Sequence, residues 1–202
     1  MTFRKEKKVL LGNLGVDNPV FVQVLGICST LAVTNVVKNT LVMCLGLVFT
    51  LTLSNATVSA LRKWIPSRVR MMVEVLIIAC YVIIVDIVLK AYLPDISRQL
   101  GPYVGLIITN CIIMGRAEAF ALTNPPWLSA VDGFSAGIGY SYVLLSISAF
   151  REILGSGTFW GYTVVWEGWT NWSIMVMAPG AFFMLAIFIW IVKGLILKDT
   201  EN

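Results

Sequence analysis

Long apolar runs dominate the sequence, and charged or turn-forming residues separate them. Each run approaches the roughly 20 residues that a helix needs to cross a bilayer. Charges, Pro, Asn and Gly bound the runs and predict six membrane spans, at residues 18–36, 40–61, 69–91, 103–122, 129–150 and 173–196. The pattern therefore predicts an all-α membrane protein, with residues 1–202 forming a single integral membrane domain.

The basic residues are distributed unevenly about these spans. With the N-terminus in the cytoplasm, most of the 15 Lys and Arg fall on the inner side, and only Lys38, Lys90, Arg98 and Arg151 remain outside. Positive charge accumulates in cytoplasmic loops, so this distribution favours six spans with both termini inside. Residues 1–10 are basic, but no apolar segment with a cleavage site follows them directly, which indicates a cytoplasmic tail and not a signal peptide.

Composition excludes several classes of protein. The chain is 58% apolar and 13% charged, whereas charged residues make up about 25% of an ordinary soluble domain. Histidine is absent, which excludes His-ligated haem, zinc sites with imidazole ligands and Ser/His or Cys/His catalysis. The net charge of +4 forms no basic patch, so nucleic acid is not an expected partner. Phosphate-binding loops and nucleophile elbows are also missing, so no catalysis is expected from this chain alone.

Two segments of the chain resemble each other. Pro19 precedes Cys28 by nine residues, and Pro102 precedes Cys111 by nine residues. A second short match, Ser-Ala-Leu-Arg at 59–62 and Ser-Ala-Phe-Arg at 148–151, follows at a similar offset. The repeats cover about 18–91 and 103–196. Because each contains three spans, an odd number, the two repeats are expected to have opposite orientations in the membrane.

Each of these cysteines lies among residues that compete for backbone hydrogen bonds. Gly26, Ser29 and Thr30 surround Cys28, and Thr109 and Asn110 precede Cys111. Such residues are typical of positions where a membrane helix is interrupted. The first helix of each repeat is therefore predicted to break near its cysteine, where inverted repeats commonly build a site close to the bilayer midplane.

The cysteines themselves allow two interpretations. Cys28 and Cys111 can be thiolate ligands of a buried iron–sulfur centre, of which one chain supplies half the four ligands. All four cysteines can instead be small buried hydrophobic residues, and only the repeat favours the first interpretation for Cys28 and Cys111. Cys44 and Cys80 have no counterpart in the opposite repeat, so they are expected to serve packing.

Four charged residues fall within or beside the spans: Glu74, Asp86, Arg116 and Glu118. A charge there costs about 2.5–3.5 kcal/mol unless it is paired or hydrated, so each suggests an ion pathway or the environment of a cofactor. Lys90 follows Asp86 by four residues, which makes an ion pair at least as plausible as a cation site. Arg116 is expected to face a cluster, a carbonyl group or another subunit.

Several segments resemble the membrane-subunit family shared by the Nqr and Rnf respiratory complexes. They are Leu-Gly-Ile-Cys-Ser-Thr-Leu-Ala-Val-Thr at 25–34 and Gly-Leu-Ile-Ile-Thr-Asn-Cys-Ile-Ile-Met-Gly-Arg-Ala-Glu-Ala-Phe at 105–120, with Asp-Asn-Pro-Val at 17–20 and Arg-Glu-Ile-Leu-Gly-Ser-Gly at 151–157. The resemblance runs nearly end to end. It is closer to the D subunits of Nqr than to the E subunits of Rnf, although Asp-Gly-Phe-Ser at 132–135 is similar to the Rnf proteins.

The resemblance implies a role in electron transfer across a bacterial inner membrane, coupled to sodium transport, within a multisubunit NADH:quinone reductase. It implies that Cys28 and Cys111 bind iron of a [2Fe–2S] cluster. A homologous subunit of opposite orientation, the E subunit in Nqr or the A subunit in Rnf, would supply the other two ligands. FMN, FAD and quinone would belong to other subunits. The alternatives are a subunit of Rnf, a ferredoxin:NAD+ oxidoreductase; an inverted-repeat transporter or channel without a redox role; and a scaffold.

Overall fold

The computed structural model describes residues 9–10, 12–13, 19–23, 25–66, 68–92, 94–159, 162–163 and 177–200. Residues 1–8 of the predicted basic tail at 1–10 and the C-terminal residues 201–202 lie outside them. The regular secondary structure of the described residues is helical except for two short antiparallel strands, β1 (Thr158–Phe159) and β2 (Tyr162–Thr163), which follow α8. The predicted all-α class is therefore confirmed in its main feature.

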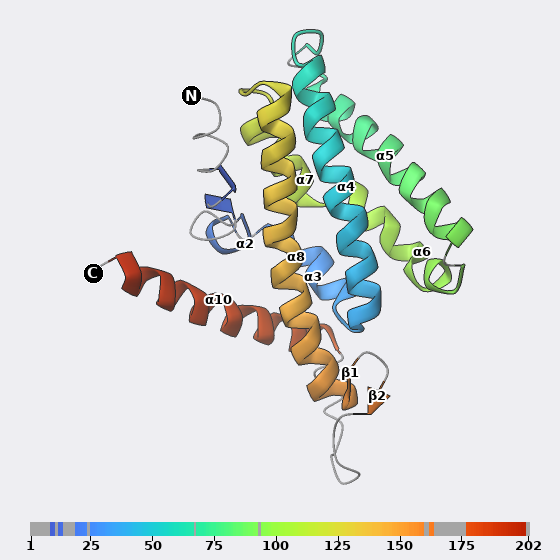
Figure 1. Cartoon of the computed structure of the whole chain (residues 1–202), viewed down its shortest axis with the longest axis vertical. Helices are drawn as coiled ribbons and strands as arrows, with labels where there is room; N and C mark the ends of the chain where they lie inside the picture. The colour runs from blue at the N-terminus through green and yellow to red at the C-terminus, as the bar shows by residue number, and fades with distance from the viewer. Residues whose placement is uncertain are drawn as a thin grey trace.

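Two long helices, α4 (Val37–Leu61) and α8 (Pro126–Ser156), lie side by side at the centre of the molecule (Figure 1). They approach closely because glycines of α8 face α4. A Cβ added to Gly133 would lie 2.9 Å from the carbonyl oxygen of Leu51, and one added to Gly137 would lie 3.1 Å from a methyl group of Val48. Small residues spaced four apart allow this close packing between membrane helices.

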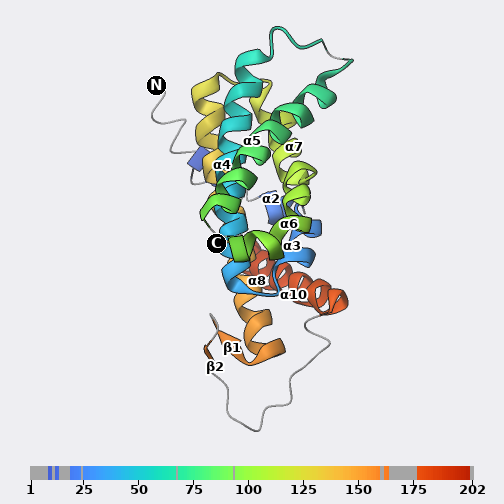
Figure 2. The same cartoon turned by 90° about the vertical axis from the view of Figure 1, so that its right-hand side faces the viewer.

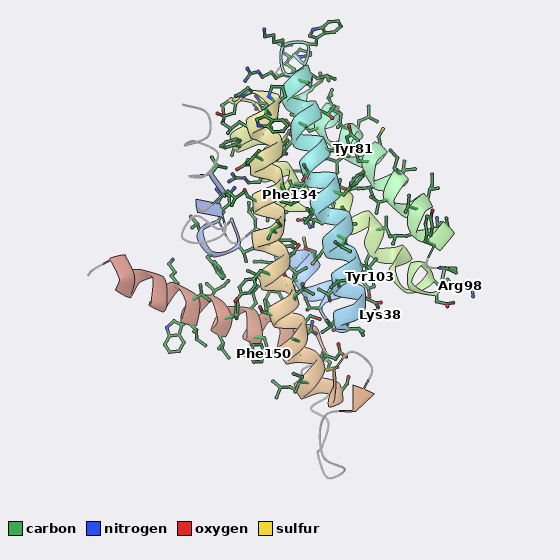
Figure 3. All side chains as sticks on the ribbon, in the orientation of Figure 1. Lys38, Tyr81, Arg98, Tyr103, Phe134 and Phe150 are labelled. Carbon is green, nitrogen blue, oxygen red and sulfur yellow. The ribbon has the colours of Figure 1, made fainter. Side chains whose placement is uncertain are left out.

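The remaining helices surround this pair. α5 (Arg70–Tyr92) and α6 (Pro94–Ile108) pack on α4, and Tyr103 of α6 lies beside α4 (Figure 3). α10 (Ala178–Thr200) crosses the bundle near one end of α8 and extends away from it, as Figures 1 and 2 show. Apolar side chains fill the centre, among them Leu47 and Leu51 of α4, Ile78 of α5 and Leu144 of α8.

Among the described residues, four helical segments are long and apolar enough to span a membrane: Val37–Leu61, Arg70–Tyr92, Tyr103–Ala121 and Pro126–Ser156. They match the spans predicted at 40–61, 69–91, 103–122 and 129–150, with α8 longer at both ends. The span predicted at 173–196 overlaps α10, whose apolar part, Pro179–Gly194, is shorter; residues 173–176 lie outside the described residues. The first predicted span, at 18–36, contains two short helices, α2 (Pro19–Val22) and α3 (Ile27–Val33).

The third candidate span is not one regular helix. From Tyr103 on, it consists of the last part of α6, a two-residue interruption, α7 (Cys111–Arg116) and a π-helix, η1 (Ala117–Ala121). The interruption falls directly before Cys111, and α3 begins one residue before Cys28. Both breaks therefore lie where the sequence predicted them.

Candidate metal centre at Cys28 and Cys111

The two cysteines of the sequence repeat come together in space. The Sγ atoms of Cys28 and Cys111 lie 3.9 Å apart, although 83 residues separate them. This distance is far longer than the roughly 2.05 Å of a disulfide bond, and both cysteines are free thiols. Cys28 is exposed and Cys111 is half-buried, so the thiol pair opens towards the surface of the chain.

A left-handed glycine makes the break before Cys28. Gly26 has φ 87° and ψ 16°, a conformation that residues with a Cβ rarely adopt. Its carbonyl oxygen accepts hydrogen bonds from the backbone N–H of Thr30 at 3.2 Å and from the hydroxyls of Ser29 at 3.0 Å and Thr30 at 2.9 Å. These bonds anchor the first turn of α3 and thereby orient Cys28.

Asn110 makes the break before Cys111. Its backbone is extended, with φ −67° and ψ 119°, and its side-chain oxygen accepts a hydrogen bond from the N–H of Ile112 at 3.1 Å. This is the usual N-cap contact, which satisfies one of the free donors at a helix start. The side-chain amide of Asn110 also donates to the hydroxyl of Ser29 at 3.3 Å, which links the two breaks directly.

Tyr140 of the central helix α8 contacts the break before Cys28 directly and is linked to the break before Cys111 through Ser29. Its side chain is fully buried, and its hydroxyl contacts that of Ser29 and donates to the Gly26 carbonyl at 3.1 Å. The thiols thus lie in front of a buried, mutually hydrogen-bonded group formed by Gly26, Ser29, Asn110 and Tyr140. Satisfied polar networks of this kind hold their members in one arrangement.

The spacing of the thiols fits two ligands of one metal atom. Two thiolates bound at about 2.3 Å to a tetrahedral metal lie about 3.8 Å apart, close to the 3.9 Å observed. Tetrahedral sulfur ligation is typical of iron–sulfur centres and zinc. No group of three or more His, Cys, Asp and Glu residues capable of holding a metal ion occurs in the part of the chain that the structure describes. A metal bound by the two thiols would therefore need its further ligands from outside these residues.

Arg116 pairs with a residue that the sequence did not single out as a site. Its guanidinium forms a two-pronged ion pair with Asp132 of α8, in which Nε lies 2.9 Å from Oδ2 and the second contact joins Nη2 to Oδ1. Asp132 is fully buried and also accepts a hydrogen bond from the side chain of Asn13 at 2.8 Å. The sequence predicted that Arg116 would face a cluster, a carbonyl group or another subunit. Within the described chain its guanidinium is paired with the Asp132 carboxylate, a partner that the sequence did not identify.

The other charged candidates separate into two arrangements. Asp86 and Lys90 form the predicted ion pair, with Oδ2 and Nζ 2.6 Å apart. Glu118 pairs with Arg70, the first residue of α5, and Glu74 lies one turn further along α5 from Arg70. Glu74 is buried and interacts electrostatically with both partners of that pair. Glu74 and Glu118 therefore form one charged group with Arg70 at the start of α5, whereas Asp86 lies near the other end of that helix.

The two remaining cysteines differ from each other. Cys44 is buried in the apolar core of α4, as the packing prediction requires. Cys80 is exposed on α5, so within the described chain it does not share the buried environment of Cys44. Tyr140 and Asp132 were missed because their roles depend on partners far along the chain. An acidic residue within an apolar segment was the available signal for Asp132.

Comparison with known proteins identifies the family of this chain. Residues 7–189 match the family described as "Rnf-Nqr subunit, membrane protein". The chain belongs to this family. It is 47% identical over 201 residues to the D subunit of the Na(+)-translocating NADH-quinone reductase of Tolumonas auensis, an alignment covering 96% of this chain and 93% of that protein. The protein of the same name from Shewanella piezotolerans is 45% identical over 200 residues, covering 96% of this chain and 95% of its own.

Proposed function

We propose that this chain is the D-type membrane subunit of a sodium-translocating NADH:quinone reductase and serves electron transfer within that complex. Relatives that carry this name align with it over nearly their whole length. The family description and the four apolar spanning segments support residence in a membrane. The remaining subunits of the complex and the lipid bilayer are its partners.

The cofactor proposed for the site is a [2Fe–2S] cluster shared with a homologous subunit. The observation that carries this proposal is the 3.9 Å separation of the Cys28 and Cys111 thiols at the starts of two interrupted helices. Cys28 and Cys111 would bind iron from this side, and their exposure leaves room for two thiolates from the partner. A cluster of this kind carries one electron at a time.

The surrounding residues hold the thiols at this spacing. Gly26 and Asn110 place the two helix starts, and Tyr140 and Ser29 join them through hydrogen bonds. Behind them, the fully buried side chains of Ile112 and Ile113 and the neighbouring core close the site to water from inside the chain. Hydrogen bonding and burial around ligand sulfurs are the means by which a protein sets a cluster's reduction potential.

The matched helix breaks also support the proposal of two inverted three-span repeats, about 18–91 and 103–196. Each break precedes a cysteine, and the thiols meet.

The arrangement of charge supports an inner-membrane protein with both termini in the cytoplasm. Arg62, Lys63 and Arg68 lie at the end of α4 and in the connection to α5, whereas Lys38 and Arg98 lie towards the opposite end of the bundle (Figure 3).

Substitution of each cysteine within the purified complex tests the cluster. We expect Cys28→Ser and Cys111→Ser each to remove about two irons per complex and one [2Fe–2S] signal in electron paramagnetic resonance, with loss of electron flow to quinone. Cys44→Ser is the matched control, because Cys44 is a buried cysteine of the core. Full iron content and wild-type turnover in both site variants would refute the proposal. The identity of the co-purifying subunits separates Nqr from Rnf.

A further inference from the structure

A second polar site lies on the same helical segment as Cys111. Arg70, Glu74 and Glu118 form it where the start of α5 meets the π-helix η1. Arg70 is ion-paired with Glu118, and both partners act electrostatically on the Glu74 carboxylate. Arg70 and Glu74 are four residues apart on α5, a spacing that places both side chains on one face.

This site contains polar atoms that the described part of the chain leaves without partners. Glu74 is only 1% exposed, yet its Oε1 accepts no hydrogen bond from the described residues. The side chains of Glu118 and Arg70 are 40% and 35% exposed. Their Oε2 and Nε atoms are nevertheless buried and without a partner among the described residues. Buried polar atoms are nearly always satisfied, so open acceptors from two carboxylates at one place indicate a missing binding partner.

The charge balance indicates which kind of partner is missing. Two carboxylates and one guanidinium leave one negative charge, whereas the other ion pairs, Arg116 with Asp132 and Lys90 with Asp86, each balance internally. An uncompensated buried charge such as that of the Glu74 carboxylate is strongly unfavourable unless a proton or a counter-ion accompanies it. A single monovalent cation would neutralise the site, and the free carboxylate oxygens are ligands of the type that hard cations take.

We propose that Glu74 and Glu118 bind one sodium ion, with Arg70 limiting the net charge of the site to one. This inference rests on the proposed function and adds to it a location within this chain for the transported ion. Glu118 follows Cys111 by seven residues along α7 and η1, which corresponds to roughly 10 Å of helix. The π-helix that carries Glu118 is a feature frequent at functional sites. The sodium site therefore lies close to the thiols but is distinct from them.

Binding of radioactive sodium ions to the purified complex tests the proposal. We expect Glu74→Gln to bind one sodium ion fewer per complex than the wild type, or to bind that ion at least tenfold more weakly. Glu118→Gln should behave likewise. Asp95→Asn is the control, because Asp95 is an exposed acid of α6, and it should leave binding unchanged. Equal stoichiometry and affinity in Glu74→Gln and Asp95→Asn would overturn the proposal.

A variant that is expected to increase sodium affinity separates ion binding from a purely structural role of these residues. Arg70→Gln leaves two carboxylates without a guanidinium, so we expect this variant to bind sodium several-fold more tightly. Weaker or unchanged binding in Arg70→Gln would count against the site. Measurements at pH 6.5 and 8.5 identify the occupant: if the site holds only a proton, Glu74→Gln binds as much sodium as the wild type at both values, and the proposal fails.

Iron content measured on the same samples distinguishes this inference from the proposed function. Glu74→Gln should retain the iron and the resonance signal that Cys28→Ser loses. Normal iron with unchanged sodium binding in Glu74→Gln would refute the sodium site alone. If the Cys28→Ser and Cys111→Ser complexes contain as much iron as the wild type, the proposed cluster is refuted, whatever sodium binding these complexes show.

Discussion

The helix starts that present the two cysteines are built differently. α3 follows Gly26, which adopts a left-handed conformation, and Tyr140 fills the space beside that glycine. α7 follows Asn110, whose own side chain caps the new helix. Both are fixed to the same central helix, α8, but α3 is held by the uncharged hydroxyl of Tyr140, whereas α7 ends in Arg116, which is paired with Asp132.

The difference shows that the repeat preserves the position of the thiol and not the means of placing it. A left-handed glycine contributes no side chain of its own, so α3 depends on the volume of Tyr140 next to Gly26. Asn110 caps its own helix and also bonds Ser29, so α7 depends less on the volume of a neighbouring side chain and more on the charge of Arg116 at its far end. The stability of the α3 side should therefore be sensitive to a larger side chain at Gly26, and that of the α7 side to loss of the charge of Arg116.

Removing the charge from the α7 side should have the largest effect. Arg116→Gln leaves Asp132 buried with Asn13 as a remaining hydrogen-bond donor. Loss of one partner of a buried ion pair typically costs about 3–5 kcal/mol. We expect a clear drop in the thermal unfolding midpoint of the detergent-solubilised complex.

The double variant Arg116→Gln/Asp132→Asn is the control for this effect, because it removes the stranded charge as well. It should recover most of the lost stability. If the single and double variants unfold alike, the ion pair is not what anchors α7.

Added volume on the α3 side should have the next largest effect. In Gly26→Ala the new Cβ would lie 2.5 Å from Cε2 of Tyr140, at a residue whose φ is 87°. Left-handed strain and overpacking together should cost about 2–4 kcal/mol. We expect a lower unfolding midpoint and less iron per complex.

Gly105→Ala is the matched control for Gly26→Ala. Gly105 lies in α6, and no atom is within 4 Å of a Cβ added there. Alanine in a helix is favoured over glycine by roughly 0.5–1 kcal/mol, so this variant should be neutral or slightly stabilising. An equal loss in both variants would show that the glycine conformation before Cys28 has no special role.

Local sequence features predicted the elements and the breaks. The apolar run at 40–61 became α4, and the residues that compete for backbone bonds, Gly26 and Asn110, lie at the interruptions. Apolar runs and helix-interrupting residues determine structure within a few positions of themselves, so they can be recognised in a single sequence. The matching distances from proline to cysteine also identified the two thiols that the structure brings together.

Partnerships between distant residues could not be predicted in the same way. Nothing near Arg116 in the sequence marks Asp132 of α8 as its partner, and nothing near Gly26 marks Tyr140. The pairing of Glu118 with Arg70 likewise depends on how α5 packs on η1. Apolar periodicity does not specify such packing, because every apolar helix face fits several neighbours.

The smallest effect, and the most specific to the cysteines, is expected from Tyr140→Phe. The ring remains beside Gly26, and only the hydroxyl that contacts Ser29 and Gly26 is lost. A hydrogen bond of this kind contributes about 0.5–1.5 kcal/mol, so folding and iron content should persist.

What should change in Tyr140→Phe is the arrangement of Cys28 relative to Cys111, because Ser29 and Gly26 flank Cys28 and lose a shared partner. We expect a shifted midpoint potential and an altered resonance line shape in redox titrations of the complex. Tyr142→Phe is the matched control, since Tyr142 is an exposed tyrosine of the same helix and should leave both unchanged. Identical spectra in the two variants would mean that the hydroxyl of Tyr140 does not fix the position of Cys28 on α3 relative to Cys111 on α7, and that core packing does so instead.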